Sequence, residues 1–224
     1  MEEIRVYFSK TGTAKYISHL DLMRTVSRAL TRAEIPLWYT EGFNPHPFLT
    51  FALPLSLGIE SYCESFDIRI VGDITNEEIK DRLNSTLPEG IVITGVSNKF
   101  SKCSDIAFAE YETVFEFDGE GISDGFSDEI KKLLDSDELI TTKKAKQKGR
   151  KIDVEVNLKD FIKDYSLTRD KNSITLIITL CAGNSRNLNP TVLFDRLLRD
   201  LKQKPDLTRI KKLRLLKDDG EEFK

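Results

Sequence analysis

The chain has 224 residues, of which 39% are hydrophobic and 32% are charged, and its formal net charge at pH 7 is -3. This composition supplies a core and argues against wholesale disorder, while the slight negative charge excludes a molecule that is basic throughout. Nucleic-acid binding would therefore depend on local patches, and the length allows one large domain or two of roughly 110 residues each.

Membrane, disulfide and metal-binding signals are missing from the sequence. No apolar run approaches the ~20 residues of a membrane span, and no N-terminal signal segment is recognisable. Cys63, Cys103 and Cys181 are far apart and form no CxxC pair. That pattern argues against a disulfide framework, a zinc site or an iron–sulfur cluster. We therefore expect a cytoplasmic protein with no membrane association, no metal and no cofactor of its own.

The first half shows alternating strand patterns and helical spacing in turn. Ser18, with Asp21 three residues later, predicts a helix start of the capping-box kind. Further elements follow from periodicity and from end signals. Strands are predicted over residues 4–10, 35–41, 64–72 and 90–99, and helices after Ser18 and over residues 75–88. The order β-α-β-β-α-β is that of the ferredoxin-like arrangement.

The second half repeats this order with an insertion. Strands are predicted over residues 109–117, 138–144, 172–180 and 208–217, and helices over residues 127–136 and 189–201. Between the second strand and the third lie a basic hairpin and a short helix. The sequence thus predicts an α+β protein of two tandem ferredoxin-like (βαββαβ) domains, residues 1–100 and 109–224, with the basic hairpin at residues 143–153.

The segment "EGFNPHPFLTF", Glu41–Phe51, predicts a rigid loop. Pro45 and Pro47 fix their own φ angles and bias Asn44 and His46 toward extended geometry. A histidine held in this way could accept a proton, donate to a phosphate or ligate a metal. Alternatively, the loop only turns the chain, and His46 bonds a backbone carbonyl.

His19, the second of the two histidines, lies in the first turn of the helix that Ser18 caps. Free N–H groups and the positive end of the helix dipole make this position suitable for an anion, and Lys10 comes just before it. Alternatively, His19 packs beside the cap. A metal bound by both histidines with Glu41 or Glu64 is conceivable, but nothing in the spacing demands it.

Two basic features suit a phosphate backbone. Arg24, Arg28 and Arg32 recur every four residues on the polar side of the first helix, and guanidinium groups grip phosphate bidentately. The segment "KKAKQKGRK", residues 143–151, contains six basic residues and no acidic one. It is the strongest electrostatic case for nucleic-acid contact in the chain. Solvated surface, with Asp21 pairing Arg24, is the alternative interpretation of both.

Common catalytic motifs are missing. The chain contains no GxxxxGK[ST], no GxGxxG after a strand, no HExxH, no GxSxG and no CxxxCxxC. The sequence therefore indicates no obvious catalytic centre of its own.

Residues 5–68 closely resemble the opening of the radical SAM-linked protein family, an uncharacterised bacterial family. The motifs that carry the resemblance are Ser18-His19-Leu20-Asp21 with Arg24, Arg28-Ala29-Leu30, Arg32-Ala33, Gly42-Phe43-Asn44-Pro45-His46-Pro47, Leu57-Gly58, Glu60-Ser61 and Glu64. The second half resembles the family only loosely, at residues 143–153 and 186–190. The resemblance implies a cobalamin-type radical SAM protein as partner and suggests RNA as the shared substrate.

We therefore expect an accessory protein without catalysis of its own that presents an RNA, a tRNA or rRNA, to a radical SAM enzyme. One alternative is a metal-independent ribonuclease of the CRISPR repeat-processing type, with His46 or His19 as the general base; its basis is fold analogy. Another is an assembly module without RNA contact. The candidate binding residues are Lys10, Ser18, His19, Asp21, Arg24, Arg28, Asn44, His46, Glu64, Lys146, Lys148, Arg150 and Lys151.

Overall fold

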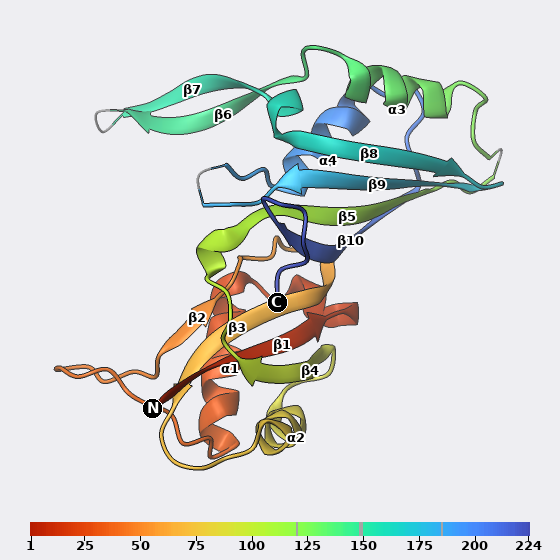
Figure 1. Ribbon diagram of the computed structural model, residues 1–224. Coiled ribbons are helices and arrows are strands. Elements are labelled where there is room, and N and C mark those ends of the chain that lie inside the picture. Colours follow the sequence, from red (N-terminus) through yellow and green to blue (C-terminus); the bar gives the residue numbers. More distant parts are fainter. Residues whose placement is uncertain (120, 148–149, 185) are drawn as a thin grey trace. The chain divides into compact units, whose positions relative to one another are not determined.

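The computed structural model describes residues 1–119, 121–147, 150–184 and 186–224, and for residues 145–147, 150 and 151 it describes the backbone alone (Figure 1). The chain divides into two compact units, Met1–Ile106 with Lys211–Lys224 and Ala107–Ile210. The predicted domains were 1–100 and 109–224; the structure groups the last residues of the chain with the first unit. In its described part the protein is a mixed α+β structure with four α-helices and mostly antiparallel strand pairing. None of the described helices is long and apolar enough to cross a membrane.

The first unit is built on the β4-β1-β3 sheet. Its elements are β1 (Glu2–Lys10), η1 (Gly12–Tyr16), α1 (His19–Arg32), β2 (Leu49–Phe51), β3 (Glu60–Ile70), α2 (Asn76–Thr86), β4 (Ile91–Asn98) and η2 (Cys103–Asp105). β1 pairs antiparallel with both β3 and β4, and β2 pairs antiparallel with β3. Lys211 and Lys212 of β10 (Leu207–Lys217) run parallel to Glu60 and Ser61 of β3.

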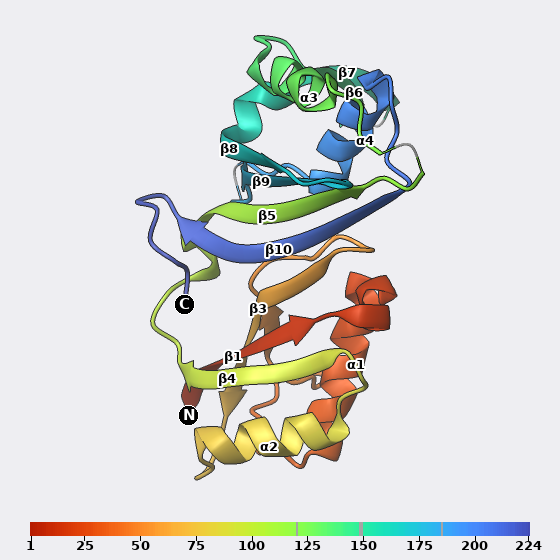
Figure 2. The same cartoon turned by 90° about the vertical axis from the view of Figure 1, so that its right-hand side faces the viewer.

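Helices α1 and α2 cover one face of this sheet (Figure 2). The alternation in β1 places Ile4, Val6 and Phe8 on that face, where each is at most 1% exposed. α1 begins at the Ser18 cap, whose hydroxyl accepts from the Asp21 N–H at 3.2 Å. Its apolar residues recur at helical spacing and pack against the strands, so the opposite side, which carries Arg24, faces solvent.

The strand predicted over residues 35–41 is wrong. The structure has only isolated bridges there, Leu37 to Ile70 and Tyr39 to Pro47, and the ladder partner of β3 is instead β2. Pro36 has no N–H to donate to a ladder, although its carbonyl accepts from the Val71 N–H at 2.8 Å. The chain follows β3 briefly, leaves as a projecting loop over residues 40–47, and returns as β2 (Figure 1).

The second unit contains a sheet and a separate hairpin. Its elements are β5 (Ile106–Glu116), α3 (Phe126–Asp135), β6 (Ile140–Gln147), β7 (Arg150–Asn157), η3 (Leu158–Phe161), β8 (Ile162–Arg169), β9 (Ser173–Cys181), α4 (Pro190–Asp200) and the first part of β10. The strand order is β10-β5-β9-β8, while β6 and β7 form their own two-stranded sheet. Phe115 of β5 contacts Phe126 and Phe194 edge-on and so joins both helices to the sheet.

Two predictions for this unit are wrong. A strand does lie near residues 138–144, as β6, but it pairs with β7 in the hairpin and not with the main sheet. The strand beside β9 is β8, which falls where a short helix was expected. The helical turn there is only the 3-10 turn η3. β8 is a sheet edge with a register shift between Ile162 and Asp164, which interrupts the period-two pattern that would have revealed it.

Candidate functional site

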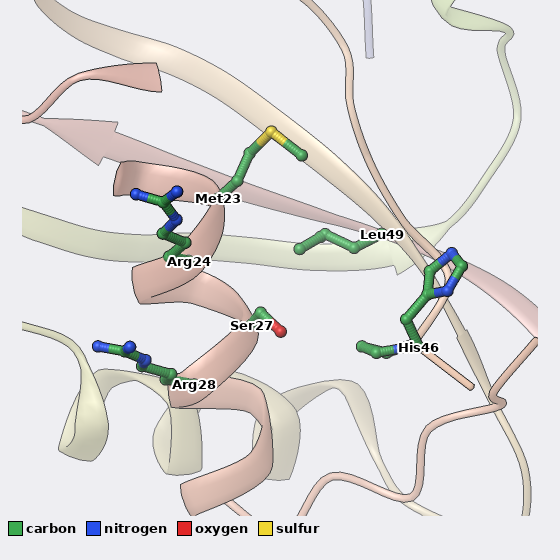
Figure 3. Close-up of a pocket in the computed structure, with 7 residues that line it drawn as sticks. Met23, Arg24, Ser27, Arg28, His46 and Leu49 are labelled. Atoms are coloured by element: carbon green, nitrogen blue, oxygen red, sulfur yellow. The ribbon is translucent and has the colours of Figure 1, made fainter. Parts of the chain in front are cut away.

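One surface pocket joins two segments that the sequence analysis had selected separately. Its volume is about 340 Å³, and it is lined by Met23, Arg24, Ser27 and Arg28 of α1 and by His46, Pro47 and Leu49. Met23 and Ser27 lie on the side of α1 nearer to Leu49 and His46, whereas the guanidinium groups of Arg24 and Arg28 project from the other side of the helix (Figure 3). The arginines therefore form an outer rim rather than a charged floor.

The polar residues at the start of α1 have defined partners. The Ser18 hydroxyl donates to Asp21 Oδ2 at 2.7 Å, and Arg24 Nη1 donates to Asp21 Oδ1 at 3.1 Å. Two hydrogen bonds lower the pKa of Asp21; the one from Ser18 has the larger effect, and the one from Arg24 has the second largest. Ser18 and Asp21 thus serve as a helix cap. Arg28 has no ion-pair partner in the described part of the chain and is the rim cation most available to a ligand.

His46 stabilises the projecting loop from within. Its Nδ1 lies 3.1 Å from both Thr40 Oγ1 and the Asn44 carbonyl oxygen, and the Thr40 N–H donates to the His46 carbonyl at 2.9 Å. A contact with a carbonyl places the proton on Nδ1 and leaves the Nε2 lone pair as an acceptor. His46 and Asn44 are exposed, and so is Phe43, which had not been singled out. The sequence signal that could have identified it is a phenylalanine within a turn-forming segment, between Gly42 and Asn44-Pro45.

Two other predicted site residues are buried. Lys10 is 0% exposed, and its Nζ donates to the Ile17 carbonyl at 2.6 Å. Glu64 is 2% exposed; its Oε1 lies 2.6 Å from Lys212 Nζ and accepts from the Ser61 hydroxyl at 2.6 Å. These side chains are therefore not available to an external ligand, and the expectation that Lys10 and Glu64 bind substrate is wrong. Their polar groups are satisfied within the fold, as burial of charge requires.

His19 lies near the buried Lys10 and Glu64, and it does not line the pocket of His46. Its ring packs edge-on against Phe51 at 5.4 Å, and its Nδ1 is buried without a hydrogen-bond partner in the described part of the structure. Burial lowers the pKa of His19; Glu64 opposes this effect and Lys10 adds to it. Its position favours a neutral ring that packs beside the cap.

The position of His19 predicts a pH dependence of stability. Because the folded-state pKa of His19 lies below the unfolded value of 6.5, only the unfolded state gains a proton just below that pH. The free energy of unfolding should therefore decrease as the pH falls from about 7 through the lowered pKa. Urea denaturation should show this decrease in the wild type and a smaller one in His19→Gln. A His46→Gln variant controls for loss of a histidine at an exposed position, and equal slopes in the wild type and His19→Gln would contradict the assignment.

The basic hairpin is described only in part. β6 and β7 pair in register, with Lys143 opposite Val154 and Lys144 opposite Asp153. Lys143 and Lys144 are exposed. Lys148 lies outside the described residues, and for the predicted contacts Lys146, Arg150 and Lys151 the structure describes the backbone alone.

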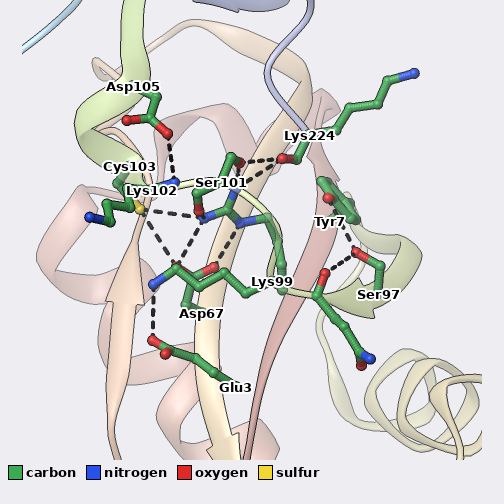
Figure 4. Close-up of polar contacts among 12 residues, drawn as sticks. Glu3, Tyr7, Asp67, Ser97, Lys99, Ser101, Lys102, Cys103, Asp105 and Lys224 are labelled. Atoms are coloured by element: carbon green, nitrogen blue, oxygen red, sulfur yellow. Dashed lines mark hydrogen bonds and ion pairs between the residues drawn. The ribbon is translucent and has the colours of Figure 1, made fainter.

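A second buried ion-pair cluster was not anticipated. Arg5 donates from Nε to Asp67 Oδ1 at 2.8 Å and from Nη2 to Asp67 Oδ2 at 3.1 Å, and both side chains are almost fully buried (Figure 4). Lys99 Nζ lies 3.1 Å from Asp67 Oδ2 and 2.9 Å from Glu3 Oε1. Arg5 also donates to the Ser101 carbonyl at 2.9 Å. The cluster fastens the segment after β4 to β1 and β3, so its role is structural.

Metal and thiol chemistry find little support in the described residues. They contain no group of three or more His, Cys, Asp or Glu side chains that could hold a metal ion. The cysteines are free thiols, and burial raises the pKa of Cys63 to about 11. At neutral pH that thiol is protonated and is a poor nucleophile.

Fold and site together define a mixed α+β protein whose first unit has an exposed pocket between α1 and the projecting loop and two buried ion-pair clusters. The chain belongs to a family described as uncharacterised proteins conserved in bacteria (DUF2344), which matches residues 3–190. That match carries no link to radical SAM proteins. No curated protein matches the chain.

Several solved structures match the chain, among them these two. One is from a crystal structure of a Cbf5-Nop10-Gar1 complex, with a TM-score of 0.51 and 8% identity over 96% of this chain and 50% of the other. This chain therefore spans half the length of that one, and the likeness supports the fold alone. The other is an unknown protein from Galdieria sulphuraria, with a TM-score of 0.26 and 12% identity over 100% of this chain and 99% of the other. A TM-score of 0.26 is too low for this structure to support an inference about fold or function.

Proposed function

We propose that the protein is an RNA-binding accessory protein that presents its RNA to a modifying enzyme. The observation that carries this proposal is the pocket whose lining includes Arg24 and Arg28 of α1, on its rim, and His46 of the projecting loop. The three side chains come from two separate segments, α1 and the projecting loop, and all are exposed. The resemblance of residues 5–68 makes a radical SAM protein the proposed enzyme, with a tRNA or rRNA as the proposed substrate.

The chemistry of the pocket suits an RNA strand that follows α1. Guanidinium groups on the rim can contact successive phosphates without reading sequence. The Nε2 lone pair of His46 can accept from a base amino group or a 2′-hydroxyl, and the exposed Phe43 ring offers a face for an unstacked base. In this proposal the arginines hold the backbone, while His46 and Asn44 position the target.

The fold is compatible with this proposal. We propose that each unit is a variant of the ferredoxin-like arrangement, because the first has the strand order β4-β1-β3 with β2 on β3, and the second has β10-β5-β9-β8. Since His19 does not line the pocket of His46, a ribonuclease at this pocket would have His46 alone as its general base.

The test compares two arginines one turn apart on α1. Arg28 lines the pocket, whereas Arg32 lies outside it and donates to the Thr86 carbonyl at 2.9 Å. Arg28→Gln should weaken binding of labelled bacterial tRNA and reduce the slope of log affinity against log salt by about 0.7 to 0.9, the value for one lost phosphate contact. Arg32→Gln should change neither. Equal effects in the two variants, or no binding by the wild type in fluorescence anisotropy, would overturn the proposal.

A further inference from the structure

The second unit contains a separate cavity of about 350 Å³ at the base of the β6–β7 hairpin. Its apolar walls include Phe161, Leu188 and Val192. Its polar groups include Thr141, Lys143 and Asn187. An apolar cavity with a few convergent polar groups is the usual form of a small-ligand site.

The segment that carries Asn187 is held in place by its neighbours. The Leu188 N–H donates to the Cys181 carbonyl at 2.9 Å, and Asn187 forms an isolated bridge with Ala182. The side chain of Asn189 is used as the cap of α4, where it accepts from the Thr191 N–H at 3.1 Å. The amide of Asn187 is exposed and can both donate and accept, as the edge of a nucleobase requires.

Positive charge gathers beside the cavity. Lys143 is exposed on its lining, and the Arg186 guanidinium lies 5.3 Å from the centre of the Phe161 ring. Arg186 also donates to the Asp160 carbonyl, which holds its side chain near that ring. A ligand that combines a flat apolar body with an anionic group matches this arrangement, and a nucleotide has both parts.

Lys143 and Lys144 have different cross-strand neighbours in the hairpin. Side chains alternate between the faces of a strand, so Lys143 shares its face with Thr141, while Lys144 lies on the opposite face. Across the ladder Lys143 meets Val154, which is 37% exposed, whereas Lys144 meets the acidic Asp153. The side chain of Lys143 thus lies beside the apolar lining of the cavity, whereas Lys144 has an acidic cross-strand neighbour.

We propose that this cavity binds one nucleotide, with its base against Phe161 and Val192, Asn187 at the base edge and Lys143 at the phosphate. The inference deepens the proposed function, because the same chemistry serves an unstacked nucleotide of a bound RNA. A free nucleotide is the other possible source. The unstacked bases of single strands are the usual target of such pockets in RNA-binding proteins.

The experiment uses the full chain, a labelled short single-stranded RNA of mixed sequence, and each ribonucleoside 5′-monophosphate as an unlabelled competitor. Lys143→Gln is paired with Lys144→Gln, which makes the same charge change on the other face. Val192→Phe fills the cavity and is paired with Val71→Phe, since both valines are exposed, at 38% and 42%. Circular dichroism checks that each variant is folded.

We expect Val192→Phe to weaken RNA binding at least about fivefold, the lower range for loss of one stacked base. Lys143→Gln should weaken it more than Lys144→Gln, and Val71→Phe should leave it unchanged. RNA binding that depends on Arg28 but not on Val192 or Lys143 would overturn the cavity inference and leave the proposed function standing. Binding of monophosphates that Val192→Phe abolishes, without RNA binding, would support the cavity as a free-nucleotide site and overturn the proposed function. Binding of neither ligand would overturn both.

Discussion

Asp67→Ala is expected to reduce the free energy of unfolding of the first unit by about 3–5 kcal/mol, the range for removing one partner of a buried ion pair. Arg5 is 0% exposed, and Asp67 is the carboxylate side chain that pairs with it, through hydrogen bonds from Nε and Nη2. Burial alone would lower the pKa of Arg5, but the hydrogen bond and charge of Asp67 raise it. Without the carboxylate, a charged guanidinium would remain buried with no ion-pair partner of its own, and the cost of its burial would be less well compensated.

Part of that cost is offset by the other contacts of Arg5. The Ser101 carbonyl continues to accept from Nη2, and the Phe223 ring lies 4.5 Å from the guanidinium carbon. Lys99 loses one of its two carboxylates but retains Glu3 at 2.9 Å. We therefore expect a folded but destabilised variant rather than a loss of structure.

Urea denaturation followed by Trp38 fluorescence measures the effect in the first unit, because Trp38 is the sole tryptophan of the chain. Glu78→Ala is the matched control in the same unit: its partly exposed carboxylate pairs with Arg82 four residues later in α2, so the change should stay within about 0.5 kcal/mol. Replacing both buried partners, as in Arg5→Met with Asp67→Leu, should restore part of the stability. Equal midpoints for Asp67→Ala and the wild type would contradict the structural role of the pair.

Glu64→Ala is expected to have an effect of similar size, about 3–5 kcal/mol, for a different reason. Glu64 is the carboxylate that balances two fully buried ammonium groups, those of Lys212 and Lys10. Burial lowers the pKa of Lys10, Glu64 opposes that effect, and Lys212 adds to it. Removing Glu64 leaves two like charges in one desolvated region.

The loss in Glu64→Ala should depend on pH in a defined direction. A lysine whose folded-state pKa lies below its unfolded value of 10.5 destabilises the fold at neutral pH, and the penalty disappears as the pH rises through the lowered pKa. The stability difference between wild type and Glu64→Ala should therefore be largest near neutral pH and should shrink as the pH rises toward about 10. Glu60→Ala is the control, since Glu60 pairs with Lys15 at a longer 3.6 Å and is partly exposed. A difference that grows with pH, or equal losses in the two variants, would contradict the arrangement.

Local patterns in the sequence determined the helix starts and the exposed features of the site. The Ser18 cap and the apolar spacing of α1 depend on residues within one or two turns, and they place Arg24 and Arg28 in solvent without reference to the rest of the fold. The prolines beside His46 likewise predicted a stiff loop, and its internal contacts are between near neighbours. Short-range chemistry was sufficient for these features.

Only the tertiary structure decided which charged residues are buried and which segments pair. Lys10 and Glu64 are charged residues of a kind that usually lies at the surface, yet both are buried. Glu64 pairs with Lys212, which is distant in the chain, and Lys10 donates to the Ile17 carbonyl. β8 was missed and residues 138–144 were misplaced because strand partners are chosen by long-range hydrogen bonding, and an edge strand with a register shift has a weak local pattern. Burial of a charge and the choice of a strand partner both depend on groups that a local stretch of sequence does not contain.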